Sequence, residues 1–432
     1  MRGKKKTPAE IPAGAPRRVA RIGVAGAGVL ARTALAEVRK AGAAPARREA
    51  IDAATREANA LQIFDAMGQL KGAFLKVGQL LSQQSHSLPE TYVRRLAELQ
   101  RQAPPMHGTL ARLQIRNELG RPPEELFAAW EREPFAAASL GQVHRARLAG
   151  GERLAVKIQY PGIERAITSD FAILRTLLRT APLGDRRPEF ERAVDEVERH
   201  LSQETDYARE ADALEEFARL LAEDESFAVP RVFRGLSSRR VLTMEYLAGR
   251  HVSDLLAETP SQEERDRLAA LLLDLFSRQT LVFGLLHADP HPGNFLFLPD
   301  GRIGLLDFGC VKRFAPRSLE IHRRLLRTPV EDEAGLLECY REAGLLDPAG
   351  EHREILLDMQ RLDAAKYHQD RLFDFGDARY LRALSALFQD LLRAGIAHPD
   401  FVLYIRTKFG LYNLFHQLGA RIDCRRIVEP YL

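Results

Sequence analysis

The spacing of hydrophobic residues predicts helices in the first quarter of the chain. Between residues 67 and 81, apolar side chains recur at intervals of three and four residues. They are Met67, Leu70, Phe74, Val77 and Leu81. This spacing places them on one helical face, so we expect an amphipathic helix here. The Pro104–Pro105 pair then ends the helical region.

The next region mixes short apolar runs with longer helical patterns. Glu152–Tyr160 and Arg240–Tyr246 are typical of strands, and Glu189–Leu221 between them predicts one long helix. From residue 250 onward the pattern is mostly helical, interrupted at 287–310 by a segment rich in glycine and proline. A small sheet followed by a larger helical region predicts an α+β protein with two lobes.

Charge is distributed unevenly along the 432 residues. The net charge is +4, but residues 1–50 contain twelve Lys or Arg and three Glu, which gives them +9 and leaves −5 for the rest. We therefore expect a flexible basic leader, able to touch anionic lipid, ahead of a body that is not basic. The leader has no interleaved aromatic residues, so a nucleic-acid function is not favoured.

The chain offers no obvious membrane anchor. The longest uncharged run near the start, Ile22–Ala31, has ten residues, whereas a spanning helix needs about 20. Its three cysteines form no Cys-x-x-Cys pair, which is typical of a reducing compartment. We expect a cytoplasmic protein, with any membrane contact peripheral and on the inner face.

Candidate phosphate chemistry lies in the glycine- and proline-rich segment. Asp289 and Asn294 stand five residues apart in a proline-braced loop. The Asp can orient or deprotonate an attacking hydroxyl, and the Asn oxygen can bind magnesium. Asp307 follows thirteen residues later, at the end of an apolar strand and before Phe308 and Gly309, where a carboxylate suits a hard cation on ATP phosphates. Order and spacing match the catalytic and metal loops of protein kinases.

Upstream residues complete a kinase-like nucleotide site. Lys157 ends the run Arg-Leu-Ala-Val-Lys and is a candidate ligand for the α and β phosphates. We expect Glu210, on a helix face shared with Asp206, to pair with it. Met244 is expected at the gatekeeper position of a hinge, where the backbone of Glu245 and Leu247 would bond adenine.

A loop rich in alanine stands where kinases have a glycine-rich loop. Its third glycine, Gly141, is retained, but alanines replace the first two. A methyl group at those positions limits positive φ, so we expect this loop to hold nucleotide differently. Its expected nucleotide contacts are Ala136, Ala137, Ala138, Ser139 and Val143.

Together these motifs resemble the UbiB/AarF/ADCK family of atypical kinase-like proteins. The resemblance includes a Lys-x-Gly-Gln motif on the predicted amphipathic helix, at Lys76, Gly78 and Gln79, and a Glu-x-Asp motif at Glu204 and Asp206. It implies that the first motif covers the place of a protein substrate and that Lys76 meets the second motif.

The resemblance implies a two-lobed protein-kinase-like fold with an N-terminal helical extension over the active site and a mostly helical C-lobe. It implies ATP and Mg²⁺ as cofactors, with Asn294 and Asp307 on the metal. The implied activity is a slow, lipid-responsive ATPase or unorthodox phosphotransferase supporting ubiquinone or other isoprenoid-lipid metabolism, with a lipid or quinone precursor as a second ligand. We expect a leader at 1–47, the extension at 48–120, an N-lobe at 121–246 and a C-lobe at 247–432.

The chain also departs from protein kinases. No activation loop or Ala-Pro-Glu signal follows Gly309, and Ala288 stands where those enzymes carry Arg. Both features argue against ordinary Ser/Thr kinase activity. A small-molecule kinase of the aminoglycoside or choline kinase type, and a nucleotide-sensing scaffold without catalysis, are the alternative interpretations; the oligomeric state is not predicted.

Overall fold

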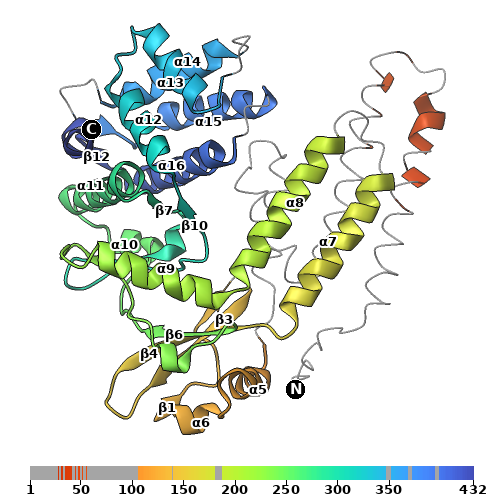
Figure 1. The fold of residues 1–432 in the computed structure, drawn as a ribbon, viewed down its shortest axis with the longest axis vertical. Coiled ribbons are helices and arrows are strands. Elements are labelled where there is room, and N and C mark those ends of the chain that lie inside the picture. The colour runs from red at the N-terminus through yellow and green to blue at the C-terminus, as the bar shows by residue number, and fades with distance from the viewer. Residues whose placement is uncertain are drawn as a thin grey trace, which may run out of the picture. The chain divides into compact units, whose positions relative to one another are not determined.

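The computed structural model describes a few positions before residue 56 and then most of the chain from residue 106 (Figure 1). The described ranges are 106–138, 140–180, 187–346, 352–367, 372–394 and 398–432. The predicted amphipathic helix at 67–81 lies outside them. The chain divides into two compact units. The first comprises Met1–His107, Ala137–Gln142 and Gln159–Thr205, and the second comprises Gly108–Ala136, Val143–Ile158 and Asp206–Leu432.

Two long helices, α7 (Ile163–Thr180) and α8 (Arg187–Glu204), belong to the first unit. The buried residues Ile163, Ile167 and Phe171 of α7 recur every four positions, which places them on one side of the helix. Arg175 of α7 forms ion pairs with α8 residues Asp195, at 2.7 Å, and Glu198. The two helices therefore pack as a pair.

Most residues of an antiparallel sheet with the strand order β1-β3-β4-β6 belong to the second unit. Its strands are β1 (Ala129–Trp130), β3 (Gly141–Arg147), β4 (Arg153–Gln159) and β6 (Val241–Glu245), and β2 (Ala136–Ala138) precedes β3. In the β4–β6 pairing Lys157 lies opposite Leu242. Strands β4 and β6 confirm the two predicted strands, and β4 is buried from Leu154 onward because both its faces are covered.

Helices and short strands fill the rest of the second unit. The helices are α5 (Gly108–Leu119), α6 (Pro123–Leu126), α9 (Tyr207–Leu220), α10 (Val252–Ala257), α11 (Gln262–Arg278), α12 (Pro316–Arg327), α13 (Glu333–Glu342), α14 (Arg353–Ala364), α15 (Ala378–Arg393), α16 (Pro399–Leu418) and α17 (Cys424–Val428). The short strands are β5 (Phe227–Ala228), β7 (Leu285–His287), β8 (Phe295–Phe297), β9 (Ile303–Leu305), β10 (Val311–Arg313), β11 (Phe373–Asp374) and β12 (Arg421–Ile422). The mostly helical character predicted after residue 250 is confirmed.

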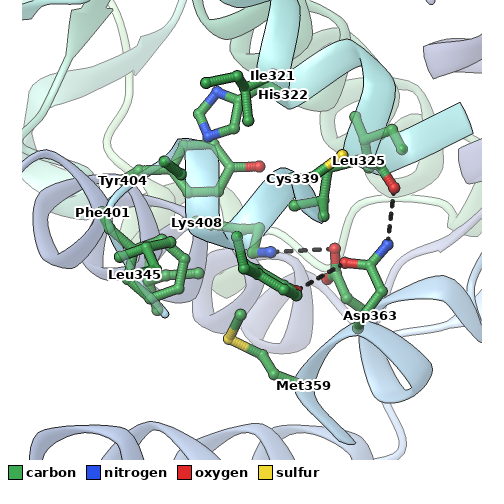
Figure 2. Close-up of a pocket in the computed structure, with 15 residues that line it drawn as sticks. Ile321, His322, Leu325, Cys339, Leu345, Met359, Asp363, Phe401, Tyr404 and Lys408 are labelled. Carbon is green, nitrogen blue, oxygen red and sulfur yellow. Dashed lines mark hydrogen bonds and ion pairs between the residues drawn. The ribbon is translucent and has the colours of Figure 1, made fainter. Parts of the chain in front are cut away.

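Among the described residues, two apolar clusters contain helices of the second unit. The larger joins residues of the sheet, α9 and the later helices, including Leu242, Phe217 and Leu272. The smaller lies among α13, α14, α15 and α16, around Tyr340 and Met359, and Figure 2 shows part of it. Each buried side chain of this kind contributes about 1.5–3 kcal/mol, so the two cores fix the helices that carry the candidate site.

The predicted single helix at Glu189–Leu221 is wrong. The structure breaks it at residues 205 and 206 into α8 and α9. Asp206 has extended backbone (φ −112°, ψ 91°) and its side chain accepts a hydrogen bond from the Ala208 amide, so it caps the N-terminus of α9. Consequently Asp206 does not share a helix face with Glu210.

No helix within the described ranges is long and apolar enough to cross a membrane.

Candidate active site

A buried ion pair joins the sheet to helix α9. Lys157 on β4 and Glu210 on α9 are 5% and 4% exposed, and Lys157 Nζ lies 2.8 and 2.9 Å from the two Glu210 oxygens. The pairing of a central strand with a helix 53 residues later is the one expected from the sequence. Because both groups are out of water, the bidentate geometry is what makes their burial tolerable.

Asp307 brings a second carboxylate to the same ammonium group. It follows β9, and its Oδ1 lies 3.4 Å from Lys157 Nζ. Its φ of 53° is unusual for a residue other than glycine. The Gly309 amide donates to Asp307 Oδ1 at 3.2 Å, which holds the carboxylate in this orientation. A strained backbone at this position directs the carboxylate toward the lysine.

The electrostatic state of Lys157 follows from these contacts. Burial alone would lower the pKa of its ammonium group. The charges of Asp307 and Glu210 outweigh that effect and hold the pKa well above its ordinary value. Lys157 is therefore a permanent cation at the junction of the strand and the two carboxylates.

The loop of Asp289 and Asn294 is tied to the Asp307 segment by backbone hydrogen bonds. The Asn294 side-chain amide donates to the Asp289 carbonyl at 3.1 Å, and the Leu306 amide donates to the Asn294 carbonyl at 2.8 Å. The His287 ring nitrogen Nε2 lies 3.0 Å from the Asp307 carbonyl oxygen. These bonds bring Asp289, Asn294 and Asp307 into one neighbourhood.

Aromatic side chains pack against the same loops. The rings of His287 and Phe308 meet edge to face with centroids 4.9 Å apart, and Phe217 of α9 lies 4.9 Å from Phe308. Such pairs add about 0.5–1.5 kcal/mol beyond burial. Helix α9 is thereby packed against the segment that carries Asp307.

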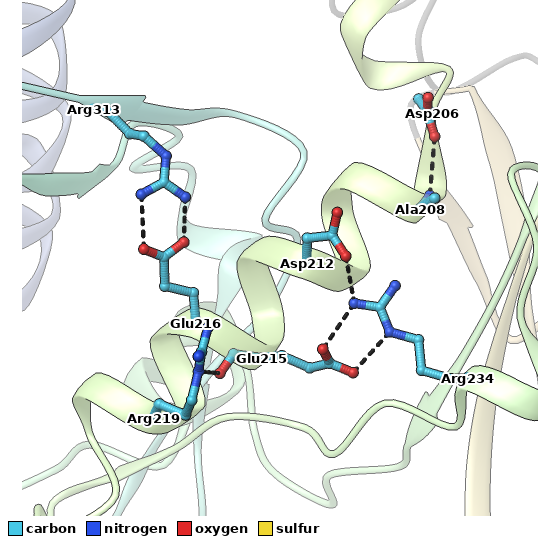
Figure 3. Close-up of polar contacts among 8 residues, drawn as sticks. All are labelled: Asp206, Ala208, Asp212, Glu215, Glu216, Arg219, Arg234 and Arg313. Carbon is cyan, nitrogen blue, oxygen red and sulfur yellow. Dashed lines mark hydrogen bonds and ion pairs between the residues drawn. The ribbon is translucent and has the colours of Figure 1, made fainter.

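Surface ion pairs connect helix α9 to Arg234 and to Arg313 (Figure 3). Arg234 pairs with Asp212 and Glu215, while Arg313 of β10 donates to Glu216 Oε1 at 2.7 Å. Strand β10 begins two residues after Gly309. The Arg313 contact therefore links the helix of Glu210 to the strand that follows Asp307.

The predicted hinge is the end of β6. Met244 is buried. The Glu245 amide donates to the Arg231 carbonyl, and the Tyr246 amide donates to the Arg153 carbonyl. Within the described part of the chain, the Leu247 amide makes no backbone hydrogen bond. The backbone N–H of Leu247, one of the two hinge groups predicted to bond adenine, is therefore not used by another backbone group in this part of the chain.

The alanine-rich loop is described in part. Ala136 and Ala137 are exposed, Ala138 and Val143 are half-buried, and Ser139 lies outside the described residues. Strand β2 contains all three alanines, so this stretch is extended.

The remaining predicted motif falls largely outside the described residues. Lys76, Gly78 and Gln79 are not among them. Glu204 ends α8, and Asp206 caps α9. The Glu-x-Asp motif therefore coincides with the break between two helices.

Sequence reasoning missed one residue that contacts the Asp289 loop. Arg406 of α16 donates to the carbonyl of Ala288 at 3.3 Å, from 118 residues away. Ala288 occupies the place of an Arg in protein kinases, and here a guanidinium reaches this loop from another helix. No local pattern marks Arg406, since charged residues on a helix usually face water.

These features define a protein-kinase-like site: a strand lysine, a helix glutamate, and two loops that present Asp289, Asn294 and Asp307. The sequence profile of the ABC1 atypical kinase-like domain matches residues 98–338, more than half of the chain. The chain belongs to this family of atypical kinases, which confirms the family and the kinase-like fold predicted from its motifs.

Relatives occur in bacteria and eukaryotes. The mitochondrial atypical kinase COQ8B of Rattus norvegicus is 30% identical over 97% of this chain and 81% of its own length. The mitochondrial atypical kinase COQ8 of Saccharomyces cerevisiae is 30% identical over 86% and 76%. An uncharacterised protein of Synechocystis, sll0005, is 36% identical over 61% of this chain, which spans only 39% of that relative.

A solved structure shares the fold. The complex of Rv3197 with erythromycin from Mycobacterium tuberculosis superposes with a TM-score of 0.61 at 27% identity. The match covers 89% of this chain and 98% of the other. The two chains therefore share their fold over most of their length.

Proposed function

We propose that this protein binds ATP with magnesium and acts as an atypical kinase or ATPase. The observation that carries the proposal is the position of Lys157, bonded to Glu210 and 3.4 Å from Asp307. This arrangement supplies one fixed cation for phosphates next to a carboxylate for a metal. Phosphoryl transfer needs little more than such positioning and charge stabilisation from a protein.

The residues present fit a magnesium ion. Magnesium is usually held by one or two protein oxygens together with phosphates and water. Asp307 offers a carboxylate that is about one-third exposed. The NH₂ group of the Asn294 side chain donates to the Asp289 carbonyl, so the side-chain oxygen of Asn294 is left to bind a cation. Asp307 and Asn294 would hold the ion, which when bound neutralises charge on the phosphates.

The other residues take roles that their positions support. Lys157, oriented by Glu210, binds the α and β phosphates. The Glu245 carbonyl and the Leu247 amide bond adenine beside Met244. Asp289 orients the attacking hydroxyl or water. The alanine-rich loop, Ala136 to Ser139 with Val143, covers the nucleotide.

The segment after Asp307 favours an unorthodox substrate. Strand β10 begins at Val311 and α12 at Pro316, so little chain is left to form a platform for a peptide. We therefore propose water or a small or lipid-linked acceptor. The setting implied by the family resemblance is ubiquinone or other isoprenoid-lipid metabolism, with a lipid or quinone-precursor ligand and peripheral membrane contact.

In this proposal residues 121–246 form the N-lobe and 247–432 the C-lobe. The basic leader at 1–47 and the extension at 48–120 precede them. Lys76, Gly78 and Gln79 regulate access to the site together with Glu204 and Asp206.

The test is magnesium-dependent ATP hydrolysis by the purified chain, with and without anionic vesicles. Asp307→Asn should lower turnover by about a hundredfold or more, because a charge that stabilises the transition state is lost. The matched control is Asp300→Asn, an exposed carboxylate paired only with Arg302 in the described structure. Unchanged turnover in Asp307→Asn would overturn the proposal.

A further inference from the structure

A cavity opens among helices α12, α13, α14 and α16 and contains none of the residues of the candidate active site (Figure 2). Most of its wall is apolar. The apolar lining residues are Ile321, Leu325, Leu326, Ala343, Leu345, Met359, Phe401 and Ile405. Several of these, such as Leu325, Ala343 and Leu345, are only half-buried, so the cavity has a mouth on the surface.

One end of the cavity carries buried charge. Lys408 is 4% exposed, and its Nζ lies 3.1 Å from Asp363 Oδ2. Lys366, 1% exposed, forms an ion pair with the other Asp363 oxygen and donates to the Asp363 carbonyl at 2.8 Å. Two ammonium groups thus share one carboxylate. Within the described ranges, no other carboxylate forms an ion pair with either lysine.

The other titratable groups of the cavity do not balance this charge. Burial, and secondarily Lys408, lowers the pKa of His322 to about 4, so its imidazole is neutral at pH 7. Burial raises the pKa values of Tyr340, Tyr404 and Cys339, which keeps them uncharged. Burial lowers the pKa of Lys366 to about 8, so it is still mostly protonated at pH 7. The cluster carries a net charge of about +1 there.

Asp363 outweighs the desolvation of Lys408 and holds the pKa of that lysine above its ordinary value, but it offsets the desolvation of Lys366 only in part. The two lysines together therefore keep one buried positive charge without a matching carboxylate, which is costly. A bound anion would remove that imbalance. The adjacent apolar wall would at the same time receive a hydrocarbon group, since ligand sites combine apolar walls with a few buried polar groups. Lys408 is the cation that lines the cavity itself.

We propose that this cavity binds a small amphipathic carboxylate, whose headgroup pairs with Lys408 and whose hydrocarbon chain packs between Leu325, Met359 and Phe401. Such a site is separate from the nucleotide site and does not depend on its assignment. It gives the chain a second ligand of a different chemical class.

The test is calorimetric titration of the full chain at pH 7 with hexanoate and, as a neutral match, 1-hexanol. We expect hexanoate to bind at least tenfold more tightly. Lys408→Met should abolish this preference, while Arg317→Met, an exposed position on α12, should leave it unchanged. Ala343→Phe should fill the mouth of the cavity and weaken the binding of both hexanoate and 1-hexanol, without altering the charges of the lysine cluster.

The proposal is overturned if hexanoate does not bind, or binds no more tightly than 1-hexanol. It is also overturned if Ala343→Phe binds hexanoate as the wild type does, a result that is decisive even if Lys408→Met fails to fold. No nucleotide enters the experiment, so its failure is distinguishable from failure of the proposed ATP chemistry.

Discussion

Lys157 shows how a single buried charge can organise a site. Its ammonium group contacts Glu210 twice and lies near Asp307, and it also lies 5.0 Å from the centre of the Tyr207 ring. In a buried pair of this kind, loss of one partner leaves the other charge desolvated and uncompensated. The stability of the fold and the binding of phosphate should therefore both depend on Glu210.

We expect Glu210→Gln to lower the free energy of unfolding by about 3 kcal/mol and to weaken ATP binding about tenfold. The amide cannot compensate the Lys157 charge, which is then drawn toward Asp307. Urea denaturation and nucleotide titration measure the two effects. Glu216→Gln is the control, since it lies on the same helix in a partly exposed pair with Arg313 and should cost less than about 1 kcal/mol. Equal costs for both variants would contradict the buried-pair interpretation.

Lys366 supplies a prediction about pH. Burial lowers its pKa to about 8 in the folded protein, whereas the unfolded chain keeps the ordinary value of 10.5. Between these values the unfolded state binds the extra proton, so stability rises with pH across that window. From pH 7 to pH 9 the gain is about 1 kcal/mol.

Lys366→Met should remove this rise. The measurement is the free energy of unfolding in urea at pH 7, 8 and 9 for the wild type and the variant. Lys312→Met, which removes a lysine paired with Asp400 at a more exposed position, should keep the wild-type dependence. The prediction fails if, relative to Lys366→Met, the free energy of unfolding of the wild type stays constant or falls from pH 8 to pH 9. The pKa of Lys366 would then not be lowered in the folded protein.

At the residue scale, the sequence predicts which residues come together where they lie close to one another along the chain. Asp289, Asn294 and Asp307 lie within one short stretch, and the structure brings their segments together through local backbone bonds. Arg406 and Lys408 were not predictable. They sit two residues apart on a long helix, and only tertiary packing determines that both are turned inward rather than to water.

At the scale of elements, the break between α8 and α9 is the informative feature. Hydrophobic periodicity continues across residues 205 and 206, so the sequence suggests one helix. The structure instead places the Asp206 side chain over the first turn of α9, where it accepts a hydrogen bond from the Ala208 amide at 3.1 Å. A capping residue competes with helix continuation, and here the cap forms, so α9 begins at Tyr207 and its first turn carries Glu210.

We expect Asp206→Ala to lower the free energy of unfolding by about 1 kcal/mol, the usual cost of losing an N-cap. ATP binding should weaken as well, because the first turn of α9 carries Glu210. Urea midpoints and nucleotide titration provide the measurements. Asp206→Asn should restore most of the loss, and Asp212→Ala on the exposed side of α9 should have a smaller effect. A variant Asp206→Ala as stable as the wild type would refute the capping role.

At the scale of the whole molecule, the order of elements was predictable and their assembly was not. Strands β4 and β6 were identified from local apolar runs, and the helical C-terminal half from its periodicity. Their pairing with Lys157 opposite Leu242, across 84 intervening residues, has no local signal. It follows from the need to bury both faces of β4, which the sequence expresses only as a continuous apolar run.

Nucleotide binding should raise the free energy of unfolding of the second unit. A nucleotide held by Lys157 of the sheet and by Asp307 and Asn294 of the loops binds only the folded state. ATP with magnesium at a hundredfold excess over its Kd should therefore raise the free energy of unfolding by about 2.7 kcal/mol. Removing magnesium with a chelator should reduce most of this gain, because Asp307 would then face the phosphates without a cation between them. Thermal and urea unfolding with ATP, with and without chelator, measure the effect, and Asp300→Asn serves as the control variant. If ATP stabilises the chain equally well after chelation, Asp307 and Asn294 are not the ligands of a metal on the nucleotide.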